Sequence, residues 1–140
     1  MPFLFDTNAI SEAMRPKPNA DYVEWLRHLP REEQFTSSVV VGEMYAGAYA
    51  SQATAKWLDR IERLVLPTMT ILSFDLPTAH EYGRIRAELR WSGQPIDEAD
   101  MMIAATAVHH GLTLVTANVS HFSRIPGLSV RGFFPGATRS

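Results

Sequence analysis

The chain has 140 residues, of which 46% are hydrophobic and none is cysteine. We therefore expect a single domain over residues 1–140 with a substantial apolar core, and we exclude a disordered tail, a disulfide framework and a thiolate zinc site. The net charge of −2 excludes the strongly basic surface with which some domains hold nucleic acid by bulk charge alone.

The predicted elements are short strands that alternate with helices. The apolar stretch PFLF stops at the polar run DTN, which is typical of a buried strand that ends in a loop or a helix cap. Pro30 stops one predicted helix and Gly111 caps another. In chain order we predict a strand at 2–5, helices at 9–14 and 20–29, a strand at 34–38, helices at 39–50 and 53–66, a strand at 70–74, helices at 76–93 and 97–111, and strands at 112–116 and 128–133.

This alternation favours an α/β fold, a three-layer sandwich with a central, mostly parallel twisted sheet flanked by helices. In such sheets the ligand binds in the crevice beyond the carboxyl ends of the strands. No signal peptide is recognisable, and no apolar run approaches the ~18 residues that would cross a membrane, so we expect a cytoplasmic protein.

Three acidic residues break the apolar pattern at places where this fold class binds ligands. Asp6 directly follows the first strand, and Asp100 shares a helical stripe with Ile103 and Ala104. Glu43 lies within a predicted helix, where its neighbours three and four residues away are apolar or small. We expect all three carboxylates to face inward and to converge.

Simpler structural roles compete with this interpretation. Asp6 could be the N-cap of the following helix, and Asp100 could be the third residue of a helix that Asp97 caps. Glu43 is too far inside its helix to cap it, although an arginine from elsewhere in the fold could pair with it. Taken singly, the cap is the better interpretation for Asp97, and for Asp100 the two are even.

Converging carboxylates require something positive among them, since a buried ionised carboxylate without a partner costs several kcal/mol or becomes protonated. The chain has no cysteine and no clear His-x-x-x-His spacing, so oxygen ligands dominate and favour Mg²⁺ or Mn²⁺ over zinc. Such ions activate water for attack on a phosphodiester. This chemistry would reconcile a slightly acidic chain with a nucleic-acid substrate.

Several motifs in this order resemble the PIN-domain ribonucleases, and most closely the VapC-type toxins of bacterial toxin–antitoxin pairs. They are FLFDTNAISE, SSVVVGEMYAG and PIDEADMMIAATAVHHGLTLVTANVSHFSRIPGL, and the resemblance runs from residue 3 to about residue 134. It implies a Mg²⁺- or Mn²⁺-dependent endoribonuclease. The implied site residues are the metal ligands Asp6 and Asp100, Glu43 as the third catalytic acid, and Thr7 and Asn8 in support.

The fourth position of the family pattern differs here. Many relatives carry Thr-x-Asp-x-x-[Asp or His]-Phe, whereas this chain reads TANVSHF. Asn118 stands in the aspartate position and can offer only an uncharged amide oxygen. Thr116 is expected to hydrogen-bond to a carboxylate or to the water of the metal, and the role of His121 is open.

The resemblance also implies partners. They are an RNA substrate, a VapB-type antitoxin that covers the acidic site and can insert an arginine or lysine, and a second copy of the chain in a homodimer. Apolar residues are candidates for the antitoxin groove, although each taken alone is better explained as ordinary core. These are Trp25, Tyr45, Tyr49 and Trp57.

Two other functions compete with this interpretation. The change to Asn118 leaves room for a catalytically weak or inactive module that binds the antitoxin and takes part in operon repression. A phosphatase of the haloacid-dehalogenase type also starts with an aspartate after its first strand, but it requires a second aspartate where this chain has Asn8.

Overall fold

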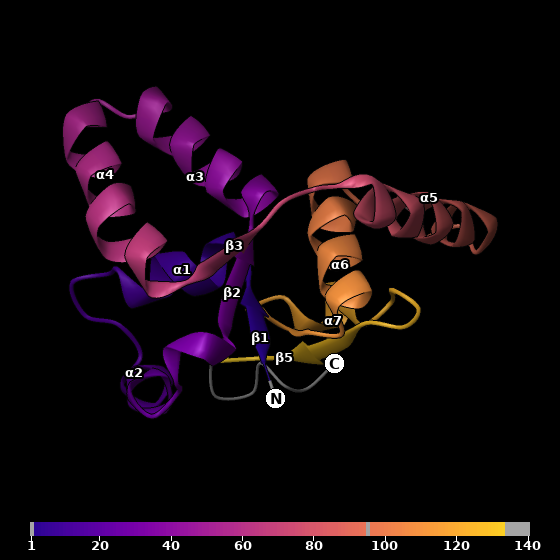
Figure 1. Cartoon of the computed structure of the whole chain (residues 1–140), viewed down its shortest axis with the longest axis horizontal. Helices are drawn as coiled ribbons and strands as arrows, with labels where there is room; N and C mark the ends of the chain where they lie inside the picture. Colours follow the sequence, from indigo (N-terminus) through magenta and orange to yellow (C-terminus); the bar gives the residue numbers. More distant parts are fainter. Residues whose placement is uncertain (1, 95, 134–140) are drawn as a thin grey trace.

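A parallel sheet forms the centre of the protein in the computed structural model, which describes residues 2–94 and 96–133 (Figure 1). Its five strands lie in the order β3-β2-β1-β4-β5, and each neighbouring pair is parallel. The predicted sandwich with a mostly parallel sheet is therefore confirmed. The strands are β1 (Phe3–Phe5), β2 (Gln34–Ser37), β3 (Thr70–Leu72), β4 (Thr113–Val115) and β5 (Ser129–Arg131).

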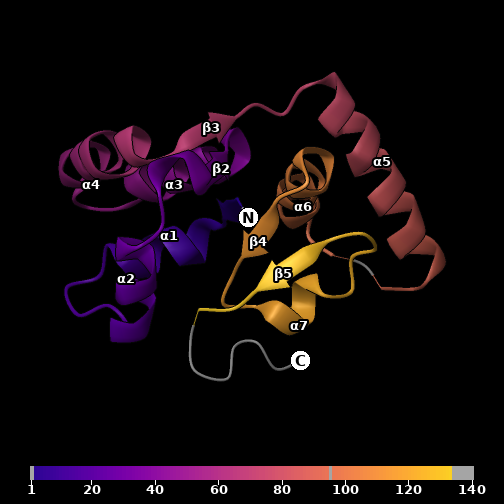
Figure 2. The ribbon, with the colours of Figure 1, turned by 60° about the horizontal axis from the view of Figure 1, so that its bottom comes forward.

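Helices flank the sheet and extend to two ends of the molecule (Figures 1 and 2). α3 and α4 run side by side at one end, while α5 packs against α6 at the other. None of the helices in the described ranges is long and apolar enough to span a membrane. The α-helices are α1 (Thr7–Ala13), α2 (Ala20–Arg27), α3 (Ser38–Ala50), α4 (Thr54–Arg60), α5 (Leu76–Trp91), α6 (Glu98–His110) and α7 (Val119–Phe122).

The two central strands β1 and β4 explain why the site lies where it does. Leu4, Phe5, Leu114 and Val115 are completely buried, as expected for strands covered on both faces. Phe5 pairs with Val115, so both strands end at the same level of the sheet. The residues that follow them are consequently brought together at one edge.

The predicted helix at 53–66 is wrong in its second half. α4 ends at Arg60, a π-helical turn covers Ile61–Val65, and a 3-10 turn covers Leu66–Thr68. Pro67 cannot donate a backbone hydrogen bond and so prevents an α-helix from continuing. The wider turn keeps Ile61 and Val65 buried but leaves Leu64 52% exposed, outside the apolar face that was predicted for it.

Other boundaries differ by a few residues. α1 begins at Thr7 rather than at residue 9, because the side chain of Asp6 caps it. Two short elements were not predicted, the 3-10 turn Arg31–Glu33 and α7. α7 has only 4 residues, too few for a helical period to show in the sequence. Gly111 ends α6 in the left-handed conformation, as predicted.

Candidate functional site

Asp6 is both a helix cap and a buried acid, so the two interpretations of this residue are compatible. Its backbone is extended and its Oδ1 accepts a hydrogen bond from the amide of Ala9 at 2.8 Å. The backbone amide of Asp6 donates to the carbonyl of Val115, which ties the end of β1 to the end of β4. Only 5% of Asp6 is exposed, so the carboxylate is almost removed from water.

Burial dominates the electrostatics of this carboxyl group. The pKa of Asp6 is raised from 3.8 to about 6, mainly by desolvation and in smaller part by the negative charges of Asp100 and Glu43. Hydrogen bonds from the Thr116 side chain and the Ala9 amide oppose this effect but do not cancel it. The ionised form is therefore disfavoured by its surroundings, and a cation in the pocket would stabilise it.

Thr116 connects Asp6 to the segment after β4. It is completely buried, and its Oγ1 accepts a hydrogen bond from the amide of Asn118 at 3.0 Å. The hydroxyl proton remains free to donate to Asp6, which matches the side-chain hydrogen bond between these two residues. Thr116 thus contacts the carboxylate, as the sequence predicted, and fixes the backbone at Asn118.

Asp100 lies in the first turn of α6 and is less buried than Asp6. Its side chain is 31% exposed, and its Oδ2 lies 3.0 Å from Nε2 of His121. Asp97 occupies the N-cap position of α6, as expected, but its side chain makes no capping hydrogen bond. The expected Asp97 cap is therefore confirmed in position and wrong in mechanism.

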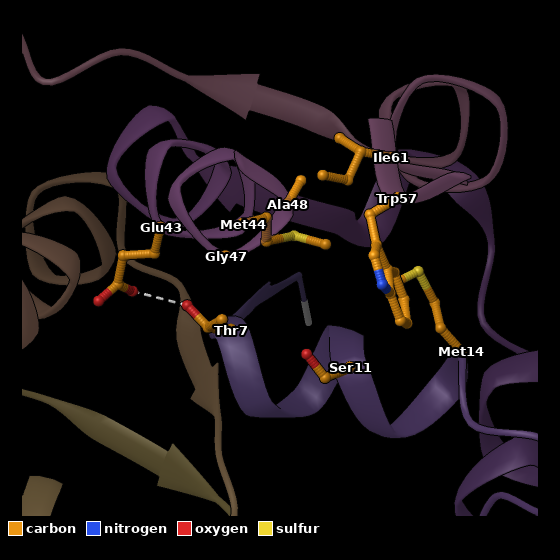
Figure 3. Close-up of a pocket in the computed structure, with 9 residues that line it drawn as sticks. All are labelled: Thr7, Ser11, Met14, Glu43, Met44, Gly47, Ala48, Trp57 and Ile61. Atoms are coloured by element: carbon orange, nitrogen blue, oxygen red, sulfur yellow. Dashed lines mark hydrogen bonds between the residues drawn. The ribbon is translucent and has the colours of Figure 1, made fainter. Parts of the chain in front are cut away.

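Glu43 is not buried, so the expectation that all three acids face inward is wrong for this residue. α3 buries the stripe Val40, Met44 and Ala48, and Glu43 lies beside this stripe, where it is exposed. Its Oε1 accepts a hydrogen bond from the hydroxyl of Thr7 at 2.6 Å (Figure 3). The contact links α3 to the start of α1.

Six of the seven predicted site residues nevertheless meet at one pocket of about 220 Å³. It contains the three acids together with their predicted neighbours at the carboxyl ends of β1 and β4. Thr116 does not line the pocket, but its side chain hydrogen-bonds to Asp6, which does. The pocket is lined by Asp6, Thr7, Asn8, Glu43, Asp100, Ile103, Asn118 and Phe122.

An apolar pocket of similar volume adjoins the acidic one and shares Thr7 and Glu43 with it. Figure 3 shows it between α1, α3 and α4, with Met14 and Trp57 at its far end. The remaining lining residues are Ser11, Met44, Gly47, Ala48 and Ile61.

The donor set of the acidic pocket fits a hard cation held partly by water. No three Asp, Glu or His side chains within residues 2–94 and 96–133 are close enough together to hold a metal ion by themselves. Mg²⁺, however, is usually bound by one or two carboxylates and several waters. Asp6 and Asp100, with the amide oxygen of Asn118 beside them, supply that set.

Residues 3–128 match the family model of the PIN domain. The chain belongs to the PIN-domain family. Toxin FitB of Neisseria gonorrhoeae is 40% identical over 124 residues, which cover 85% of this chain and 89% of FitB. The tRNA(fMet)-specific endonuclease VapC of Salmonella typhimurium is 33% identical over 128 residues, covering 91% of this chain and 95% of that protein.

Solved structures give the same relationship. This PIN domain superimposes on a chain of the DNA-bound VapBC complex from Salmonella typhimurium with a TM-score of 0.87 and 31% identity, covering 96% of this chain and 99% of that one. Toxins, ribonucleases and endonucleases are thus the proteins that this chain is similar to. The resemblance stated from the sequence motifs is confirmed.

The four aromatic residues considered for an antitoxin groove separate in the structure. Trp25 packs against Phe3 and Phe5, with the guanidinium of Arg131 4.4 Å from the centre of its ring, so it is partly buried against the core. Tyr45 also packs partly buried against the core. Trp57 lines the apolar pocket and Tyr49 is 68% exposed.

Arg124 lies near the site within the described residues, and the sequence did not predict it there. Its Nη2 lies 3.0 Å from Nδ1 of His121, on the side of the ring away from Asp100. The sequence shows only a basic residue three positions after His121, and the turn that brings the two side chains together follows a helix of 4 residues, too short for a period to show.

Proposed function

We propose that this PIN domain is a divalent-metal-dependent endoribonuclease that acts as the toxin of a VapBC-type toxin–antitoxin pair. The observation that carries this proposal is the convergence of Asp6, Glu43, Asp100 and Asn118 on one pocket at the carboxyl ends of β1 and β4. These residues come from four separate parts of the chain. A fold has little reason to collect carboxylates at one point unless a cation and a phosphate are to meet there.

Each residue has a role that follows from its contacts. Asp6 and Asp100 would hold the cation, and Thr116 keeps the Asp6 carboxylate in a fixed orientation through its hydroxyl. Asn118 offers an amide oxygen to the cation or to water. When bound, Mg²⁺ or Mn²⁺ would lower the pKa of water at the site and balance the negative charge that develops on the phosphodiester.

Glu43 and Thr7 act at the mouth of the pocket. The Thr7 hydroxyl points one carboxylate oxygen of Glu43 toward α1. The second oxygen takes part in no hydrogen bond within residues 2–94 and 96–133, and it would accept one from the attacking water. Asn8 lines the same pocket, and we expect it to contact the scissile phosphate. RNA is then held mainly by the cation, which agrees with a chain whose net charge is −2.

The partner is a VapB-type antitoxin. Its apolar side chains would occupy the pocket between α1, α3 and α4, and a basic side chain would reach the acids across the shared residues Thr7 and Glu43 (Figure 3). The chain would form a homodimer within that complex. Transfer RNA is the first substrate to test, since relatives such as the Salmonella VapC are named as tRNA endonucleases.

The test is RNA cleavage by the purified chain freed from antitoxin, with Mg²⁺, with Mn²⁺ and with EDTA. Asp100→Asn should lower the rate by at least about 100-fold, because the ion is worth several kcal/mol to the transition state. Asp97→Asn is the matched control, since Asp97 is an exposed acid of the same helix terminus outside the pocket. Cleavage that survives both EDTA and Asp100→Asn would refute the assignment.

A catalytically weak antitoxin-binding module that helps to repress its operon is the second candidate. Two observations favour it: Asn118 replaces an acid, and the acids in the described ranges do not form a ready-made three-ligand cluster. Metal titration discriminates the two candidates. Antitoxin binding without saturable Mn²⁺ binding or RNA cleavage would favour the module.

A further inference from the structure

Three side chains form a hydrogen-bonded series that leads from the protein surface to the acidic pocket. Asp100, in the first turn of α6, contacts Nε2 of His121 at the end of α7. Arg124, which is exposed, contacts Nδ1 of the same ring at 3.0 Å. A second bond, from Nε of Arg124 to the carbonyl of His121 at 3.2 Å, holds the guanidinium at two points.

The chemistry of arginine fixes the direction of these hydrogen bonds. A guanidinium group carries only donors, so Nδ1 of His121 must accept from Arg124. The ring proton therefore sits on Nε2 and is donated to Oδ2 of Asp100. The contact between His121 and Asp100 is thus a directed hydrogen bond from Nε2 to Oδ2.

This arrangement excludes His121 as a metal ligand in the geometry that the structure has. Metal binding requires a ring nitrogen with a free lone pair. Nε2 carries a proton that faces Asp100, and the lone pair of Nδ1 faces Arg124. The role of the ring must be exerted through Asp100.

Asp100 needs such support more than Asp6 does. Asp6 is held by the Ala9 amide and the Thr116 hydroxyl within a buried environment. The Asp100 side chain is 31% exposed. Among the described residues, His121 is the one that donates a hydrogen bond to its carboxylate. Its Oδ1 takes part in no hydrogen bond within that part of the chain and is available to another ligand.

We infer that His121 and Arg124 are positioning residues that lock the Asp100 carboxylate with Oδ2 occupied and Oδ1 free for a divalent cation. This inference rests on the proposed metal-dependent function and adds the residues that prepare one of its ligands. Hydrogen-bond partners of metal-binding carboxylates typically affect metal affinity by about 10- to 100-fold. Without His121, Asp100 would sample several side-chain rotamers, and binding would have to select one of them.

The test is a titration of the full chain with Mn²⁺, in which the EPR signal of the free ion measures how much of it remains unbound. His121→Phe keeps a ring but removes the donor, and should weaken Mn²⁺ binding by about 10- to 100-fold. His121→Gln restores an N–H near the position of Nε2 and should recover most of the affinity. Arg124→Met should weaken binding less than His121→Phe, and Arg90→Met, which removes an exposed arginine of α5, should leave it unchanged.

NMR supplies a readout that does not depend on the metal. Long-range ¹H–¹⁵N correlation spectra of the metal-free chain should show His121 protonated on Nε2 alone, and Arg124→Met should allow the other tautomer to appear. A His121 ring protonated on Nδ1 in the wild type would overturn the inference. Equal Mn²⁺ affinities for the wild type, His121→Phe and His121→Gln would also overturn it, provided that thermal unfolding shows all three folded.

Failure of the proposed function would look different. A wild-type chain that binds no Mn²⁺ would contradict the metal site itself, and with it any role of His121 toward a metal. A wild-type chain that binds Mn²⁺ and cleaves RNA while the His121 variants match it would leave the proposed function standing and refute only the positioning role.

Discussion

Replacing Asp6 by asparagine should stabilise the metal-free protein above pH 6. The carboxyl group is 5% exposed, and burial raises its pKa from 3.8 to about 6. A rise of that size is worth about 3 kcal/mol, since each pKa unit corresponds to about 1.4 kcal/mol. Asparagine has the same shape and can still accept the hydrogen bond from the Ala9 amide.

The sign of the pH dependence follows from proton binding. Between pH 3.8 and about 6 the folded protein binds a proton at Asp6 that the unfolded chain has released, so stability falls as the pH rises through this window. Below it the carboxyl is protonated in both states, and the penalty vanishes. The hydrogen bond from the Thr116 hydroxyl favours the ionised carboxylate, and the net rise in pKa already includes this opposing effect.

The net expectation is a metal-free Asp6→Asn variant about 1–3 kcal/mol more stable than the wild type at pH 8, with no advantage near pH 3.5. Urea unfolding in EDTA at the two pH values measures this difference. Asp59→Asn is the control, because Asp59 is an exposed acid of α4. A variant that is less stable than the wild type at pH 8, or a difference that does not change with pH, would refute the electrostatic reasoning.

Three further predictions concern other parts of the site. Thr116→Val removes a buried hydroxyl that hydrogen-bonds to both Asp6 and the amide of Asn118. It should lower the free energy of unfolding by about 1–3 kcal/mol and weaken Mn²⁺ binding. An unchanged midpoint of urea unfolding would contradict this prediction. Glu43→Gln should slow RNA cleavage at least about 10-fold, because the variant lacks the group that accepts a proton from the attacking water. It should change the free energy of unfolding by less than about 0.5 kcal/mol, because the side chain is exposed. A large loss of stability would show a structural role instead. Tyr22→Phe removes the hydroxyl that donates a hydrogen bond to the carbonyl of Ala9, and should lower the free energy of unfolding in urea by about 1 kcal/mol. Tyr82→Phe is the control, because it removes an exposed hydroxyl and should lower this free energy by less.

The sequence predicted the sheet and the positions of the acids because both depend on local patterns. Short apolar runs that end in polar residues mark buried parallel strands, and Asp6 follows such a run directly. Asp100 was found because an acid on an apolar helical stripe is costly unless it has a function. The residues alone favoured Asp97 as a helix cap and left the role of Asp100 even, and the family resemblance then matched the motif aspartate to Asp100.

The parts that failed depend on tertiary contacts. Exposure of Glu43 could not be predicted, since α3 buries the Val40, Met44 and Ala48 stripe and the helix has apolar or small residues on several sides. The π-helical turn at Ile61–Val65 arises where an α-helix meets Pro67, and no helical period shows it in advance. The contact between Arg124 and His121 requires α7, which is too short to be recognised from sequence.

The most direct test of the central claim is a crystal structure of the full chain grown with Mn²⁺, with the ion located by its anomalous scattering. We predict a peak between the carboxylates of Asp6 and Asp100, beside Asn118 and with His121 still hydrogen-bonded to Oδ2 of Asp100. A map without a peak at this position at saturating Mn²⁺, or with Mn²⁺ bound elsewhere on the chain, would contradict the account.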